Sequence, residues 1–231
     1  MTLRRIIGLP VLGSRQLQST DYCRMCGLHA STPESLERHL YFCPFGGLRN
    51  EIHSGLAWQV IAILKEAGFG PNQIVTELNG LRPRDSTRPG DVVVLNFGGD
   101  GQHLLIDVAC TTVWGNSHAG RCGTVPGFSA LDRENDKFTN DRNSGSPVST
   151  FHGGNHILVP FVVEDGGRIG DQGQSILRVL AERAVSVGHI RTPDSWGTLG
   201  PAALVAHTVR RWQQTAKAVS LATYETFHPS G

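Results

Sequence analysis

Three cysteines and one histidine near the N-terminus have the spacing of a zinc site. Two residues separate Cys23 from Cys26, twelve residues follow, and three residues separate His39 from Cys43. A two-residue gap lets one turn present two thiolates, and a three-residue gap places His39 and Cys43 on adjacent turns of one helix. Four protein ligands close a tetrahedral Zn²⁺ shell, which is typical of structural zinc. The sequence therefore predicts a C2HC zinc finger.

The residues between these ligands agree with a zinc finger. Thr32-Pro33 is a good helix N-cap followed by proline at the first helical position, and Leu36 lies one turn before His39. His29 is a competing ligand, but it follows the second cysteine by only two intervening residues, so His39 is preferred. The alternative is that the cysteines are free buried thiols. The five cysteines form no regular disulfide framework, which favours a nuclear or cytoplasmic protein over a secreted one.

Two aspartates lie in a predicted β-hairpin further along the chain. Asp91 opens one apolar run, Asp107 lies in a second run that starts at His103, and a glycine-rich loop around Gly99 separates them. Opposed residues of antiparallel strands have a constant index sum, and a three- or five-residue loop around Gly99 makes that sum 198. Asp91 then faces Asp107 with Cβ atoms about 4.5–5.5 Å apart.

Two carboxylates at this distance repel each other unless one is protonated or a cation lies between them. Carboxylate oxygens suit a hard cation such as Mg²⁺, so the hairpin is a candidate metal site. A plainer interpretation makes Asp91 a turn residue and Asp107 an ordinary exposed strand residue.

The composition is that of a globular chain with little net charge. It has 231 residues, 21 Lys+Arg against 20 Asp+Glu and 39% hydrophobic residues, which argues against intrinsic disorder. The apolar run at residues 157–163 contains Pro160 and is far shorter than the roughly 20 residues of a membrane span, so we expect no membrane contact. Residues 1–49 have a net charge of +3, residues 50–164 of −4 and residues 165–231 of +2. This division allows metal binding at the centre and phosphate contacts at the ends, although chance variation explains it equally well.

The hydrophobic patterns predict the elements that position these residues. We expect helices over residues 50–67, 171–187 and 201–221, a helical segment at 132–138, and strands over 73–78, 91–96, 103–109 and 157–163. The rest of residues 110–155 is expected to be irregular. Glu164, after the last strand, is a candidate metal ligand but more simply a surface acid, and Trp212 is expected to anchor the last helix on the domain.

Four short motifs follow one another along the central part of the chain. They are Arg49-Asn-Glu51-Ile-His53, Arg88-Pro-Gly-Asp91, Leu105-Ile-Asp107-Val and Pro160-Phe-Val-Val-Glu164-Asp-Gly-Gly. Together with the zinc motif and the segment before it, this order resembles the C-terminal region of retrotransposon-like reverse transcriptase polyproteins, over roughly residues 3–185. In that family a cysteine/histidine zinc motif precedes a restriction-like endonuclease of the PD-(D/E)XK type.

The resemblance implies a fold and a set of site residues. The family's core is a mixed β-sheet flanked by helices, α/β (α+β) in class, here with a small N-terminal zinc finger. Glu51 matches the acid of the first helix, Asp91 the aspartate of the PD element and Asp107 the acid of the next strand, and these would bind catalytic Mg²⁺ or Mn²⁺. The lysine expected two residues after Asp107 is replaced by Ala109, and Lys137 is the candidate to reach in from another element. The plain alternative makes Lys137 a solvated helix charge.

These features predict a metal-dependent DNA endonuclease of retroelement origin. The expected domains are a lead-in and zinc finger at residues 1–47, the endonuclease core at 48–190 and a helical extension at 191–231. DNA is the expected partner, with RNA or an RNA–DNA hybrid and a place in a larger reverse transcriptase polyprotein as open alternatives. The replacement by Ala109 also leaves two other functions open. One is a catalytically decayed, zinc-stabilised nucleic-acid-binding module, and the other is a protein-interaction domain.

Overall fold

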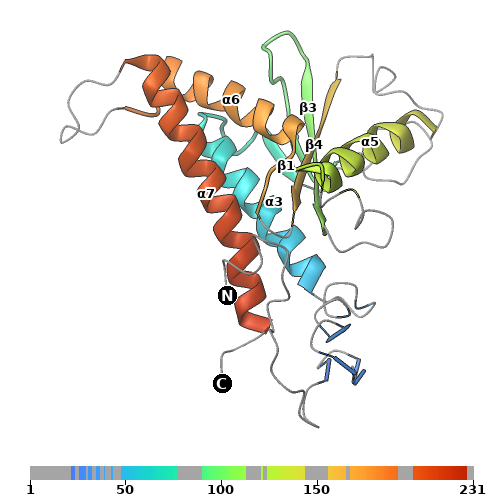
Figure 1. The fold of residues 1–231 in the computed structure, drawn as a ribbon. Helices are drawn as coiled ribbons and strands as arrows, with labels where there is room; N and C mark the ends of the chain where they lie inside the picture. Colours follow the sequence, from blue (N-terminus) through green and yellow to red (C-terminus); the bar gives the residue numbers. More distant parts are fainter. Residues whose placement is uncertain are drawn as a thin grey trace.

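A four-stranded mixed sheet with helices on both faces forms the main body of the molecule (Figure 1). The computed structural model describes residues 22, 23, 26–29, 31, 32, 35, 36, 39, 43, 48–76, 90–112, 121, 124–143, 156–164, 167–191 and 200–227. The elements, in chain order, are α3 (Leu48–Glu66), β1 (Ile74–Thr76), β2 (Val92–Val94), β3 (His103–Thr111), α5 (Phe128–Asn143), β4 (His156–Glu164), α6 (Asp171–Ser186) and α7 (Pro201–Phe227).

The order of strands in the sheet is β1-β2-β3-β4. The first two neighbouring pairs are antiparallel, whereas β3 and β4 are parallel. A short loop can join only antiparallel neighbours, and the parallel pair is joined by a long connection that contains α5. The predicted α+β class and the mixed sheet flanked by helices are therefore confirmed.

The register of the β2–β3 hairpin is the predicted one. Val92 pairs with Ile106 and Val94 with Leu104, so the index sum is 198. The hairpin loop turns through residues with positive φ, among them Gly99 at 82°. Beyond the last pair the ladder departs from this register, because the Asp91 amide donates to the Ile106 carbonyl at 3.0 Å. Asp91 and Asp107 lie at the same end of the hairpin pairing, but Asp91 contacts α3 on one face of the sheet and Asp107 contacts α5 on the other.

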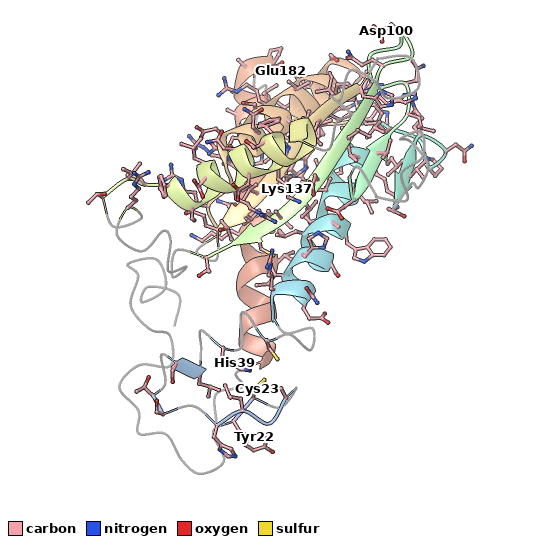
Figure 2. All side chains as sticks on the ribbon, turned by 90° about the vertical axis from the view of Figure 1, so that its right-hand side faces the viewer. Tyr22, Cys23, His39, Asp100, Lys137 and Glu182 are labelled. Atoms are coloured by element: carbon pink, nitrogen blue, oxygen red, sulfur yellow. The ribbon has the colours of Figure 1, made fainter. Side chains whose placement is uncertain are left out.

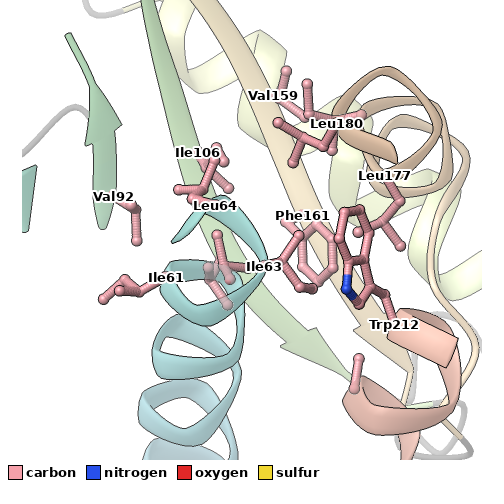
Figure 3. Close-up of a cluster of buried hydrophobic side chains, with 14 of the residues drawn as sticks. Ile61, Ile63, Leu64, Val92, Ile106, Val159, Phe161, Leu177, Leu180 and Trp212 are labelled. Carbon is pink, nitrogen blue, oxygen red and sulfur yellow. The ribbon is translucent and has the colours of Figure 1, made fainter. Parts of the chain in front are cut away.

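The two faces of the sheet are covered by different helices. Helices α3, α6 and α7 pack on one face and α5 lies against β3 and β4 on the other (Figure 1). On the first face, Phe161 of β4 and Trp212 of α7 meet Leu177 of α6 in the main hydrophobic core (Figure 3). Trp212 is 1% exposed and its indole N–H donates to Glu66 at 2.7 Å, which confirms its predicted role as an anchor.

Some helices differ in length from their predictions. Helix α5 spans 16 residues, whereas only 132–138 was expected to be helical within an otherwise irregular segment. The sequence of α5 is mostly polar, so its apolar periodicity is weak and a contact from outside the helix helps to fix its start. Residues 77, 78 and 144–155 lie outside the described part of the chain. None of the helices formed by the described residues is long and apolar enough to cross a membrane.

Two buried glutamates complete the N-termini of helices that lie next to them in space. Glu164 at the end of β4 accepts hydrogen bonds from the Ser129 hydroxyl at 2.8 Å and the Ala130 amide at 3.2 Å, both in the first turn of α5. Glu134 of α5 accepts one from the Gln172 amide of α6 at 3.0 Å. First-turn amides have no hydrogen-bond acceptor inside their own helix. A carboxylate at this position accepts their hydrogen bonds and interacts favourably with the helix dipole. Glu164 is therefore buried and is not the predicted surface acid, because its Oε1 caps α5. Its part as a metal ligand stays a prediction.

Replacing Glu164 with alanine should destabilise the protein by about 2–4 kcal/mol, because it leaves buried donors without an acceptor. Urea unfolding followed by circular dichroism measures the change. Glu182→Ala, at an exposed position of α6, is the control and should change the free energy of unfolding by no more than about 0.5 kcal/mol. Equal effects of the two substitutions would contradict the capping role.

Candidate active site and metal centre

The four predicted zinc ligands come together in the structure. The candidate ligand atoms of Cys23, Cys26, His39 and Cys43 all lie within 4.8 Å of one another. The sulfur atoms of Cys23 and Cys43 are 3.7 Å apart, and the sulfur of Cys26 is 3.0 Å from Nε2 of His39. Zn–S bonds of about 2.3 Å give tetrahedral S–S edges of about 3.8 Å, whereas a disulfide needs about 2.05 Å. The spacing of the two sulfurs thus fits zinc, and the cluster can hold a zinc ion.

A tight turn presents the first two cysteines of this cluster. The Gly27 amide donates to the Cys23 carbonyl at 2.7 Å, and the Cys23 amide donates to the Leu28 carbonyl at 2.9 Å. Gly27 has a φ of 75°, which glycine adopts without strain. His29, the competing ligand, is exposed and lies outside the cluster, with its ring 5.4 Å from that of Tyr22. Figure 2 shows Cys23 and His39 next to each other and Tyr22 in the same part of the molecule.

The turn that leads toward His39 is fixed by a reciprocal cap. The Ser35 amide donates to Oγ1 of Thr32, and the Thr32 amide donates to Oγ of Ser35, each at 3.1 Å. This capping box confirms Thr32 as the predicted N-cap. Leu36 packs with Cys23 and Cys43 in a small buried cluster of its own, and among the described residues of this segment it is the buried apolar side chain besides the metal ligands.

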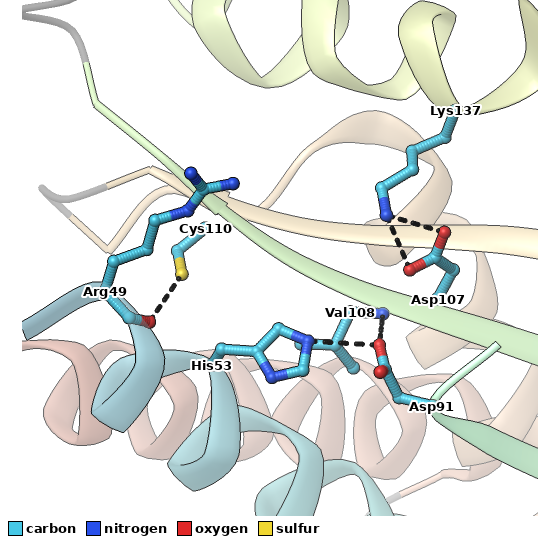
Figure 4. A network of polar contacts seen from close by, with 7 residues as sticks. All are labelled: Arg49, His53, Asp91, Asp107, Val108, Cys110 and Lys137. Carbon is cyan, nitrogen blue, oxygen red and sulfur yellow. Dashed lines mark hydrogen bonds and ion pairs between the residues drawn. The ribbon is translucent and has the colours of Figure 1, made fainter. Parts of the chain in front are cut away.

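A second polar cluster lies where β2 begins, between α3 and α5 (Figure 4). Lys137 of α5 donates to both carboxylate oxygens of Asp107 on β3, each at 2.8 Å. Asp107 is the one partly exposed residue in the middle of a strand that is otherwise buried between its two ends. Helix α5 covers this face of the sheet, which is how a residue distant in sequence reaches the strand acid. The candidate lysine is therefore in contact with Asp107, and its catalytic role stays a prediction.

Asp91 joins the same cluster from the start of β2. Its Oδ2 accepts the Val108 amide at 2.8 Å and Nε2 of His53, on α3, at 3.2 Å. Helix α3 is held over β3 near its start, where the Cys110 thiol donates to the Arg49 carbonyl at 3.3 Å. The carboxylate of Asp91 thus receives one backbone and one side-chain donor at the end of the hairpin pairing.

The charges of this cluster are coupled. Burial alone would raise the pKa of Asp91, but the hydrogen bond and charge of His53, with the Val108 amide, bring it below its ordinary value. The hydrogen bond to Asp91 in turn raises the pKa of His53. Burial raises the pKa of Asp107, and the Asp91 charge adds to this against the opposing effect of Lys137. Asp91 is therefore a carboxylate at neutral pH, while Asp107 is the acid that gains most from a nearby cation.

Glu51 does not take part in these contacts. It lies exposed near the start of α3, and within the described residues no hydrogen bond or ion pair joins it to Asp91 or Asp107. Two residues further along the helix, on a different side of it, His53 makes the contact with Asp91 instead. Sequence reasoning missed His53, although it lies in the same motif as Glu51. Among the described side chains, the cysteine/histidine cluster is the only group of three or more potential metal ligands. The role of Glu51 as a magnesium ligand therefore stays a prediction.

The substitution Asp91→Asn should lower the pKa of His53, because it replaces the negatively charged acceptor that stabilises the imidazolium with a neutral amide. In the wild type this pair adds stability below the pKa of an unfolded histidine, and that stability is lost as the pH rises through the higher folded pKa. A titration of the His53 ring followed by NMR measures the shift. Asp100→Asn, in the exposed hairpin loop, should leave the His53 pKa unchanged. An unchanged His53 pKa in Asp91→Asn would contradict the contact.

Comparison of the chain with protein-family models, with curated proteins and with solved structures finds no match. The function is therefore argued from the chemistry of the two clusters.

Proposed function

We propose that this chain is a metal-dependent endonuclease that hydrolyses phosphodiester bonds of DNA, with a restriction-like core and a structural zinc finger. The observation that carries the proposal is the Lys137 ammonium on Asp107, with Asp91 directly before the neighbouring strand β2. A lysine, two strand acids and a mixed sheet flanked by helices are the parts that the resemblance to retrotransposon-like polyproteins implies. Here the lysine comes from α5, and Ala109 stands where the family's lysine is expected.

The acid pair suits a hard divalent cation. Mg²⁺ keeps several waters and is usually bound by one or two carboxylates together with substrate phosphates, so Asp91 and Asp107 are a sufficient protein contribution. Burial raises the pKa of Asp107 and the Asp91 charge adds to the rise, which supports this fit because a cation beside the two acids would offset both effects. When bound there, Mg²⁺ or Mn²⁺ would supply Lewis-acid stabilisation of phosphate charge and an activated water.

The remaining residues of the cluster position the Asp91 carboxylate and supply a positive charge. His53 donates through Nε2 and the Val108 amide donates from the other side, so both hold the Asp91 carboxylate in one orientation. Lys137 carries the positive charge that offsets negative charge developing on a phosphate, and it lies within reach of water because its side chain is 21% exposed. Glu51 is retained as a candidate third ligand that would have to turn toward the acids when metal and DNA bind.

The zinc cluster supports the same function indirectly. With four protein ligands the ion would be structural, and it would hold together a segment whose described residues bury one apolar side chain, Leu36, besides the cysteines. Residues 1–49 have a net charge of +3, which suits contact with nucleic-acid phosphates. Retroelement origin, a place in a larger polyprotein, and a nuclear or cytoplasmic site of action belong to the same proposal.

Nicking of supercoiled plasmid tests this function. The zinc-loaded chain should convert supercoiled DNA to open circles in Mg²⁺ or Mn²⁺ and should not do so without them. DNA binding that weakens with salt but gives no nicking would favour the decayed binding module. The absence of both nicking and binding would favour the protein-interaction domain, and either result contradicts the nuclease.

A further inference from the structure

A basic pocket lies beyond the carboxyl end of β4, and none of its lining residues belongs to the acid cluster or to the proposed catalytic machinery. It encloses about 330 Å³ between the segment that follows β4 and helix α7. Three cationic side chains and three amide side chains line it, with no acid among the lining residues; they are Arg168, Arg210, Lys217, Gln174, Gln213 and Gln214.

The arrangement of α7 explains why these side chains gather. Its buried face repeats every four residues through Thr208, Trp212 and Ala216, and it packs on α3 and α6. The pocket residues of α7 lie at positions 210, 213, 214 and 217, which is the spacing of a second stripe along one helix face. Gly167, with a φ of 80°, leaves room for the Lys217 stem, since a Cβ there would collide with it.

The three cations of this pocket are not neutralised inside the described part of the chain. None of them forms an ion pair there, whereas Arg211, on the flank of α7 that faces α3, pairs with Glu66. Three cationic side chains with no acid among the lining residues give the pocket a positive charge, which attracts an anion. The amides add neutral donors, which suit the several oxygen atoms of a phosphate.

We infer that this pocket binds phosphate groups of a nucleic-acid backbone. The inference rests on the proposed function for the identity of the ligand, and it adds a contact surface on α7 to the acid cluster. A phosphodiester suits this pocket because it presents several oxygen acceptors and a negative charge, and no carboxylate of the lining competes with it for the cations. Such a contact positions the strand and carries no base specificity.

The salt dependence of DNA binding tests the pocket. Binding of the full chain to a fluorescent 20-base-pair duplex is measured in zinc-containing buffer without magnesium, so that no chemistry is required. A triple variant that combines Arg168→Gln, Arg210→Gln and Lys217→Gln should bind DNA about 10- to 100-fold more weakly near 0.1 M salt. It should also reduce the slope of log K against log salt by about 2–3. Arg210→Gln alone, at an exposed position, should give an intermediate loss.

Lys65→Gln, an exposed lysine near the end of α3, is the matched control and should change binding less than about two-fold. Triple and control variants that bind alike would overturn the phosphate site, even if the wild type nicks DNA. Loss of binding in the triple variant without any nicking by the wild type would uphold the site and reject the nuclease. Stabilisation of the wild type by inorganic phosphate, with unchanged DNA binding in the triple variant, would assign the pocket to a small phosphate ligand and overturn the inference.

Discussion

Asp107→Asn should lower the rate of plasmid nicking about 10³-fold in Mg²⁺. The substitution is nearly isosteric, so β3 and its neighbours keep their packing. It removes the charge that would bind the cation, and it leaves Lys137 without its carboxylate partner. The initial rate of conversion of supercoiled to open-circular DNA measures the effect.

Glu182→Gln removes one exposed acid from α6 and is the charge-matched control for that experiment. It should nick DNA at the wild-type rate. Undiminished nicking by Asp107→Asn would remove this residue from the site.

Cys43→Ser should abolish stoichiometric zinc binding and unfold the N-terminal segment. Metal binding by a structural zinc site of this kind is worth on the order of 10–16 kcal/mol, and the buried cluster of Leu36 with the cysteines cannot replace it. The main body has a separate core and should keep its own urea transition. Zinc content by atomic absorption and limited proteolysis of the N-terminal segment measure the two effects.

Cys110→Ala provides the control, because Cys110 is a buried thiol on β3 outside the zinc cluster. It should bind one zinc ion per chain and resist proteolysis in the N-terminal segment as the wild type does. Equal zinc content in Cys43→Ser and wild type would show that the cluster is not the zinc site. Zinc loss in both variants would implicate a different ligand set.

Local rules predicted the features that depend on residues close in sequence. The index sum of the hairpin follows from one short loop, and the zinc ligands and the Thr32 cap follow from fixed spacings within about twenty residues. Gly68, with a φ of 88°, ends α3 where the sequence placed the end of that helix. These elements can be predicted from the local sequence because turn chemistry and periodicity specify them.

Features that depend on contacts distant in sequence were missed. Helix α5 is polar and gains its first-turn acceptor from Glu164, which lies on a strand that comes later in the chain. His53 meets Asp91 only because the packing of α3 over the sheet places it there, and no spacing rule links the two residues. The contact of Lys137 with Asp107 could be predicted only through the family resemblance, since α5 crosses the sheet at a position that periodicity does not specify.

The binding of Mn²⁺ to the zinc-loaded chain, counted by electron paramagnetic resonance without DNA, tests the acid pair most directly. We expect one Mn²⁺ per wild-type chain, and none in a variant that combines Asp91→Asn with Asp107→Asn. Equal binding by the two proteins, or no binding by the wild type, would contradict a catalytic metal between these aspartates.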